Sequence, residues 1–145
     1  MGRGPPVPSV EEPLLGTCLC GGVRLRITGP FLSASYCHCR HCQKRTGSPA
    51  SAQGRVAQEH FELLDGHDLL ESYVVGEGTR AKVFCRRCGA SLFSGEPLSE
   101  PEVSVRLGLF DDDPGIRPKV RAFTDSAASW APVPDDLPHF PGPPR

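Results

Sequence analysis

Seven cysteines are the residues of this chain best suited to chemistry, and they fall into three close groups. The groups are a CxC pair at Cys18 and Cys20, a CxCxxC run at Cys37, Cys39 and Cys42, and a CxxC pair at Cys85 and Cys88. Thiolates two or three positions apart can aim their sulfurs at one ion, and zinc is commonly bound in this way. An odd number of cysteines also strands one thiol in any scheme of disulfides. The spacing therefore predicts zinc sites.

The first and last cysteine pairs together supply the four ligands of a closed zinc site. Each pair is followed by glycine, in CLCGG from Cys18 and in CRRCG from Cys85. Glycine after the second cysteine suits a metal knuckle that needs a left-handed backbone. A four-thiolate site of this kind is structural, and its zinc contributes on the order of 10 kcal/mol to folding. The alternative is that these cysteines are simply small buried hydrophobic side chains.

The central group, Cys37, Cys39 and Cys42, offers only three thiolates. Three protein ligands and an exchangeable fourth position are the arrangement of a catalytic zinc. In one alternative, His38 or His41 supplies a fourth ligand and makes a second structural site; in another, the CxxC part is a redox pair. The third thiol and the lack of a βαβ pattern argue against the redox interpretation, so we expect an open zinc site. Both histidines are candidates, by position alone, for a general acid.

A short polar stretch follows the third cysteine of this group. Lys44 and Arg45 place two cations beside the thiolates, and Thr46 and Ser48 add hydroxyl groups. Cations offset the negative charge of a thiolate-rich site and can hold a carboxylate of an incoming molecule. These four residues are therefore candidate contacts for the anionic group of an incoming ligand. The alternative is an ordinary solvated turn.

Alternating apolar and polar residues indicate the strands that must position these cysteines. The clearest patterns cover 23–27 and 103–109, where every second residue is apolar. Weaker strand patterns cover 32–37, 50–56, 69–75, 80–84, 91–93 and 119–123, with turn residues between them. No segment predicts a helix of three turns, and the best helical pattern is one short turn at 40–45. The predicted class is all-β, built of short antiparallel strands.

Composition divides the chain into an arm, a body and a tail. We expect residues 1–13 to be a flexible arm, residues 14–131 to form one zinc-binding domain, and residues 132–145 to form a Pro-rich tail. Leu137 and Phe140 are expected to pack this tail on or near the domain. Sixteen glycines, sixteen prolines and a hydrophobic content of 38% leave a thin core. Metal binding is therefore expected to add to the stability of the fold.

The balance of charge excludes some classes of partner. With 16 basic and 17 acidic side chains the formal net charge is −1, so the chain lacks the basic character of a nucleic-acid-binding protein. No run of 18 apolar residues is present that could span a membrane. The first residues lack the apolar core of a signal peptide, so we expect the cytoplasm, where thiols stay reduced. Nothing in the sequence indicates an oligomeric state.

Four segments carry a family resemblance from about Leu15 to Phe140. They are GTCLCGGVRLRITGP, YCHCRHCQKRTGS, FCRRCGASLFS and SWAPVPDDLPHF. In this order they resemble the glutathione-dependent formaldehyde-activating enzyme (Gfa) family, also called the centromere-protein-V/Gfa domain. The resemblance implies a β-tent fold of small antiparallel sheets with two zinc ions per chain. It places the structural zinc at Cys18, Cys20, Cys85 and Cys88, and the catalytic zinc at Cys37, Cys39 and Cys42.

The resemblance also implies an activity, the formation of S-hydroxymethylglutathione from glutathione and formaldehyde, which is classed as a carbon–sulfur lyase. The expected partners are thus a small-molecule thiol such as glutathione and a small aldehyde, or a related pair. Because one scaffold can host unlike functions, the fold and the metals are expected to carry over better than the substrate. One alternative is a non-catalytic zinc module that binds a protein or nucleic acid. Another is a chain that only buffers metal or electrophiles.

Overall fold

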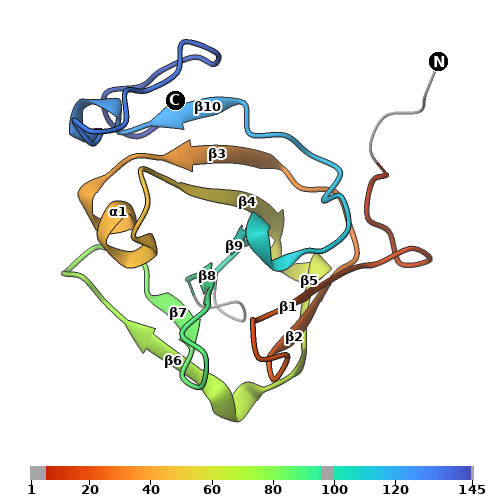
Figure 1. The fold of residues 1–145 in the computed structure, drawn as a ribbon. Coiled ribbons are helices and arrows are strands. Elements are labelled where there is room, and N and C mark those ends of the chain that lie inside the picture. The colour runs from red at the N-terminus through yellow and green to blue at the C-terminus, as the bar shows by residue number, and fades with distance from the viewer. Residues whose placement is uncertain (1–5, 96–99, 145) are drawn as a thin grey trace.

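The computed structural model describes residues 6–95 and 100–144, and most of its regular structure is strand. A small sheet has the order β1-β2-β5 and a large sheet the order β10-β3-β4-β9-β8-β7-β6 (Figure 1). The strands are β1 (Leu14–Thr17), β2 (Arg24–Ile27), β3 (Ser33–Cys37), β4 (Ser51–Ala57), β5 (Phe61–Asp65), β6 (Leu70–Tyr73), β7 (Lys82–Cys85), β8 (Ser91–Ser94), β9 (Glu102–Arg106) and β10 (Val120–Ala122). The prediction of an all-β fold is confirmed.

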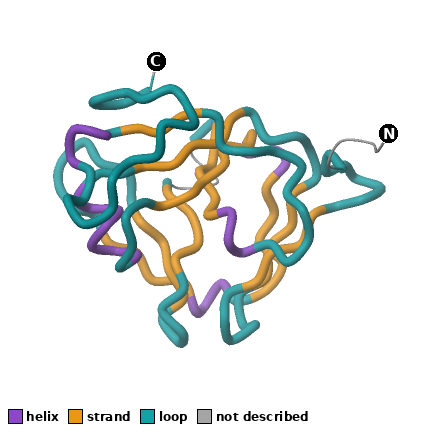
Figure 2. Tube along the Cα trace, turned by 45° about the horizontal axis from the view of Figure 1, so that its top comes forward, coloured by secondary structure: helices purple, strands orange, loops and turns teal. Residues whose placement is uncertain are grey.

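Helical structure is confined to short pieces, drawn in purple in Figure 2. The α-helix α1 (Arg40–Thr46) covers the short helical turn that the sequence predicts. The 3-10 turns among the described residues are η1 (Gln58–His60), η2 (His67–Leu69), η3 (Leu107–Leu109) and η4 (Thr124–Ser126). The second half of the predicted strand 103–109 is therefore wrong, because β9 ends at Arg106 and the chain turns there. Within the described residues, no helix combines the length and the apolar character needed to cross a membrane.

One strand pair departs from the antiparallel expectation. β10 lies parallel to β3, with Val120 opposite Ser35 and Ala122 opposite Cys37. The chain crosses from β9 to the far edge of the large sheet before it pairs, which leaves it running in the same direction as β3 (Figure 1). The expectation that all strands pair antiparallel is thus corrected at this edge. The other strand pairs are antiparallel.

The two faces of the large sheet differ in chemistry. Val83, Phe93 and Val105 lie opposite one another on neighbouring strands, and all three are buried in the core. Since side chains alternate along a strand, the residues next to them point to the other face. That face carries Lys82, Ser94 and Ser104, which also lie opposite one another. We call it the polar face, and Cys37 is on it because β3 continues the same register through β4.

The tail returns along β10. The backbone of Phe140 donates to the carbonyl of Arg121 at 2.9 Å, and Phe123 donates to Gly142 at 3.0 Å. The Arg121 guanidinium pairs with Asp136 through Nε at 2.9 Å. The predicted arm, 1–13, and the predicted tail, 132–145, lie partly outside the described residues, at 1–5 and at 145.

Candidate metal centre

The first and last cysteine pairs meet in space. The four sulfurs of Cys18, Cys20, Cys85 and Cys88 all lie within 4.8 Å of one another. Two of the separations are 3.5 Å, between Cys18 and Cys20, and 3.9 Å, between Cys20 and Cys85. A tetrahedron with Zn–S bonds of about 2.3 Å needs sulfurs about 3.8 Å apart. The four-thiol cluster therefore fits one zinc ion, as the spacing predicts.

Each pair is shaped by a tight turn that ends in a left-handed glycine. Gly21 has φ +80° and donates to the carbonyl of Cys18 at 3.1 Å. Gly89 has φ +79° and donates to the carbonyl of Cys85 at 2.7 Å. Only glycine adopts such angles without strain. The predicted left-handed glycine after CRRC is confirmed, and these turns bring both sulfurs of a pair to one side.

Backbone donors support negative charge in the four-thiol cluster. The N–H of Val23 donates to the sulfur of Cys18 at 3.3 Å. Burial acts to raise the pKa of Cys88, but hydrogen bonds from backbone groups such as Ala90 and from neighbouring thiols lower it to about 6. Zinc binds cysteine as thiolate, so a lowered thiol pKa favours the bound form.

The second cluster forms where β3 runs into α1. Cys37 ends β3, Cys39 is the N-cap of α1, and Cys42 lies in its first turn. The Cys39 sulfur accepts the N–H of Cys42 at 3.3 Å, and the three sulfurs lie within 4.8 Å of one another. Among the described residues, no histidine, aspartate or glutamate joins this group. We call it the triad.

The two histidines beside the triad lie in different surroundings. His38 is buried, and its Nε2 lies 3.2 Å from Nη1 of Arg121, on the side of the tail. Burial and the charge of Arg121 lower the pKa of His38, which favours the neutral ring. His41 is exposed at the edge of a cavity. Neither histidine stands with the three sulfurs as a fourth ligand.

Within the triad, Cys42 is the sulfur whose thiolate form is favoured. The hydrogen bond between Cys37 and Cys42 lowers the pKa of Cys42 to about 4 and raises that of Cys37, because one sulfur donates to the other. Arg45 also lowers the pKa of Cys42 by its charge, and its Nη2 lies 3.9 Å from the Cys42 sulfur. A metal ion that binds all three sulfurs as thiolates would displace the remaining thiol protons to solvent.

The triad opens onto a cavity of about 810 Å³ above the polar face. Cys37, Cys39 and Cys42 lie in its wall, with the serines and cations of the sheet opposite them. Its basic side chains are Arg45, Arg55, Arg80, Lys82, Arg106 and Lys119. No described lining residue is acidic. We call this space the cationic cavity; its volume lies within the usual range for small-molecule sites.

Of the four predicted anion contacts, Arg45 alone lines the cationic cavity. Lys44 is exposed outside it. Thr46 donates to the carbonyl of Cys42 at 2.7 Å, and Ser48 donates to the carbonyl of Ala50 at 2.8 Å. These hydroxyl groups close the end of α1, and the described lining does not include them.

Two further cations of the cavity, Arg106 and Lys82, were not predicted as site residues. Arg106 is only 7% exposed, and its Nη2 donates to the hydroxyl of Ser94 at 2.5 Å. Lys82 reaches the same hydroxyl at 3.5 Å. In the sequence both residues sit at the polar positions of alternating strands, which indicates a solvated face. Their role depends on which strands pair across the sheet, and the sequence pattern does not contain that information.

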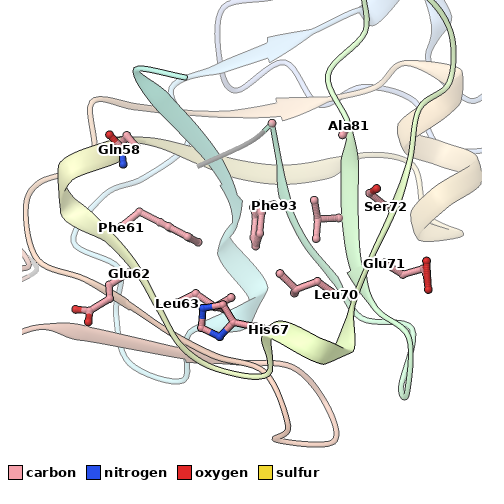
Figure 3. Close-up of a pocket in the computed structure, with 12 residues that line it drawn as sticks. Gln58, Phe61, Glu62, Leu63, His67, Leu70, Glu71, Ser72, Ala81 and Phe93 are labelled. Atoms are coloured by element: carbon pink, nitrogen blue, oxygen red, sulfur yellow. The ribbon is translucent and has the colours of Figure 1, made fainter. Parts of the chain in front are cut away.

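A second cavity of about 560 Å³ lies on the other face of the large sheet. Phe61, Leu63, Leu70 and Phe93 point into it, and Glu62 and Glu71 lie at its rim (Figure 3). The rings of Phe61 and Phe93 meet edge to face at 5.1 Å between centroids. This cavity holds no cysteine and is mainly apolar. Of these two cavities, the cationic cavity is the one lined by cysteines.

Fold and site together define a small all-β protein with two cysteine clusters suited to metal ions. The chain belongs to the glutathione-dependent formaldehyde-activating enzyme family, whose model matches residues 13–126. Among solved structures, a protein from Rhodobacter sphaeroides is similar, with 24% identity and a TM-score of 0.56. The match covers 72% of this chain and 92% of that one, and it supports the fold.

Proposed function

We propose that this protein is a zinc-dependent carbon–sulfur lyase that forms or cleaves the adduct of a thiol with a small aldehyde. The expected adduct is S-hydroxymethylglutathione, from glutathione and formaldehyde, or a related compound. One observation carries the proposal: a group of three thiols, with no fourth described ligand, faces a cavity large enough for a small molecule. The family to which the chain belongs bears the name of this reaction. The cytoplasm, where thiols stay reduced, is the proposed compartment.

The two clusters take different parts in this proposal. Cys18, Cys20, Cys85 and Cys88 would hold a structural zinc, because four sulfurs complete its coordination. Cys37, Cys39 and Cys42 would hold the catalytic zinc. When bound there, zinc supplies a Lewis acid with one exchangeable position, which lowers the pKa of a thiol that occupies it. The chain would thus carry two zinc ions.

The side chains of the cavity would bind and orient the substrates. The cations opposite the triad attract the carboxylates of glutathione and hold its sulfur near the cysteines. Holding two reactants together is a large part of the rate gain in such a reaction. In the forming direction the thiol loses its proton, a carbon–sulfur bond forms, and the carbonyl oxygen gains a proton. His41 lines the cavity and is exposed, so we assign it the transfer of that proton from solvent.

The alternative, a non-catalytic zinc module for protein or nucleic acid, has less support. Nucleic-acid-binding surfaces present their cations along an accessible face. Here Arg106 and Lys82 lie on the floor of a cavity, where a phosphodiester backbone has poor access. Binding of single-stranded RNA that weakens steeply with salt would favour this alternative.

Exchange spectroscopy tests the activity. Formaldehyde and glutathione combine without help, so the measured quantity is the rate at which 13C label passes between free formaldehyde and the adduct at equilibrium. The zinc-loaded protein should accelerate this exchange, and the Cys39→Ser variant, with its triad broken, should not. A wild-type protein with both sites filled that leaves the rate equal to that in buffer contradicts the proposed lyase.

A further inference from the structure

Arg106 is a buried cation that has no acidic partner among the described residues. Its side chain donates to the hydroxyl of Ser94 at 2.5 Å and to the hydroxyl and carbonyl of Ser104 at 3.4 Å. These partners are neutral, and its Nε is buried with no hydrogen-bond partner. Burying a guanidinium without a counter-charge is costly, so proteins pair such groups. The charge of the triad sulfurs acts on Arg106 without a hydrogen bond to it, so the position implies a contacting negative partner that the described residues do not provide.

The residues around Arg106 add further positive charge. Three guanidinium groups in the described residues have a buried, unpartnered Nε, at Arg45, Arg80 and Arg106, and all three line the cationic cavity. Lys82 is half-buried beside them. Burial and the charge of Arg45 lower the pKa of Arg106 to about 10, and burial and the charge of Arg106 lower that of Lys82. Like charges have been brought together here at the expense of stability.

The triad with a bound metal ion would not neutralise the positive charges of the cavity. Arg55 and Arg80 pair with Glu102 and Glu100 at 3.6 and 2.8 Å. The remaining cations of the lining, which form no ion pair with a described carboxylate, are Arg45, Lys82, Arg106 and Lys119. Three thiolates around one divalent ion leave a single negative charge. Several positive charges in the cavity therefore remain for a ligand.

The sheet register gives these groups the form of an anion site. Lys82, Ser94 and Ser104 lie side by side on three neighbouring strands, and Arg106 follows Ser104 on the same face. Ser94 is shared, because both Arg106 and Lys82 reach its hydroxyl. A guanidinium fork, an ammonium and a hydroxyl in one row match the oxygens of a carboxylate, sulfonate or phosphate. The row rests on strands, which hold it rigidly.

We propose that Arg106, Lys82 and Arg45 form an oxyanion subsite that binds the acidic group of the same molecule whose sulfur enters the triad. The inference rests on the proposed function and narrows its substrate class to thiols that carry an oxyanion. Arg45 lies between the sulfur site and the oxyanion subsite, because its guanidinium is next to the Cys42 sulfur and also lines the cavity. A neutral thiol of the same length would bind at the triad but would make no ionic contact with the oxyanion subsite.

Titration calorimetry with two matched thiols tests the subsite. The zinc-loaded full chain is titrated with 3-mercaptopropionate and with 3-mercaptopropionamide, which have the same thiol and nearly the same shape. We expect the carboxylate to bind at least about tenfold more tightly, as for one charge-assisted hydrogen bond. Lys82→Gln, at a half-buried position where folding is less at risk, should reduce that preference severalfold.

Thermal unfolding in sulfate gives a readout that needs no thiol. Sulfate bound at the subsite stabilises the folded state only, so at millimolar concentrations and constant ionic strength, where its general salting-out effect is small, it should raise the Tm of the wild type in a concentration-dependent way. Arg106→Gln should remove this sulfate-dependent rise and, with the uncompensated charge gone, should unfold at an equal or higher temperature than wild type in sulfate-free buffer. Arg24→Gln is the control, because Arg24 is exposed on the small sheet and pairs with Asp65. It should retain the full rise.

The outcomes separate this inference from the proposed function. If both thiols bind equally and sulfate has the same effect on wild type and Arg106→Gln, the subsite is refuted while a thiol site at the triad remains. If sulfate stabilises through Arg106 but neither thiol binds, the oxyanion subsite stands as a site for a free anion and the proposed lyase loses its substrate. A preference for the carboxylate that falls severalfold in Lys82→Gln supports both.

Discussion

The sulfur of Cys20 lies 3.9 Å from that of Cys85, although 65 positions separate them in the chain. Cys20 follows β1 of the small sheet, and Cys85 ends β7 of the large sheet. The four-thiol cluster therefore joins the two sheets at one point. A metal ion bound there would hold elements of both sheets together and so add to the stability given by the apolar core.

Loss of the fourth sulfur of this cluster should unfold the protein. We expect Cys88→Ser to lose its structural zinc and its native circular dichroism, since structural zinc contributes on the order of 10 kcal/mol to folding. Zinc per chain, measured by atomic absorption, and circular dichroism are recorded on the same sample. A Cys88→Ser protein that stays folded with one zinc fewer contradicts the structural role.

Cys39→Ser should behave differently. Its serine can still accept the N–H of Cys42, as the Cys39 sulfur does at 3.3 Å, so α1 keeps its cap. The variant loses one of three thiolates and should retain one zinc per chain in a folded protein. Cys39→Ala loses both ligand and cap, and should be less stable than Cys39→Ser by about 1 kcal/mol. Unfolding of Cys39→Ser comparable to that of Cys88→Ser would refute the division of roles.

The glycine of the second knuckle is needed for its backbone angle rather than for space. Gly89 has φ +79°, and a Cβ there would meet no atom within 4 Å. Gly89→Ala should therefore cost about 1 kcal/mol of stability, from the left-handed angle alone. Gly76→Ala, equally open but without a positive φ, is the control and should be nearly neutral. Denaturant unfolding of the zinc-loaded variants measures the difference; equal effects would contradict it.

Phe93 is the largest fully buried side chain of the core, and it stacks edge to face on Phe61. Phe93→Ala should lower the free energy of unfolding by about 3–5 kcal/mol, because the space it leaves adjoins a cavity and does not collapse. Tyr73→Ala removes a ring that is 63% exposed and should change stability by less than about 0.5 kcal/mol. A loss at Phe93 no larger than that at Tyr73 would contradict the assigned core.

The tail contact gives a prediction about pH. Hydrogen bonds from Arg121 lower the pKa of Asp136 below its ordinary value. An acid with a depressed pKa stabilises the fold above its unfolded pKa, and this contribution is lost as the pH falls through the folded value. Asp136→Asn should therefore lower Tm by a few degrees, and by the same amount at every pH between about 6 and 8. A difference that changes across that window would show that another group is responsible.

Local patterns predicted what is local in this structure. The spacing of Cys18 and Cys20 and of Cys85 and Cys88 identified the two halves of one cluster, because each half is a single turn. Alternation identified β2 and most of β9 for the same reason. β1 and β5 were missed, since each is short and only their pairing with β2 makes them strands.

What could not be predicted depends on long-range pairing. The parallel placement of β10 beside β3 follows from a crossing of the whole sheet. The burial of Arg106 follows in the same way, because a polar position in an alternating strand normally faces water. Only the register that sets Arg106 opposite Gln53 of β4 reveals that its face forms the floor of a cavity.

X-ray absorption at the zinc edge tests the central claim, that one cluster is closed and the other open, most directly. A four-sulfur site and a three-sulfur site with one oxygen or nitrogen ligand average to about 3.5 sulfurs per zinc. Adding glutathione to the fully loaded protein should raise this average to about 4, because its thiol replaces the oxygen or nitrogen ligand at the triad and leaves the four-sulfur site unchanged. An average that is already 4 without thiol, or that stays at 3.5 with glutathione in excess, would contradict the account.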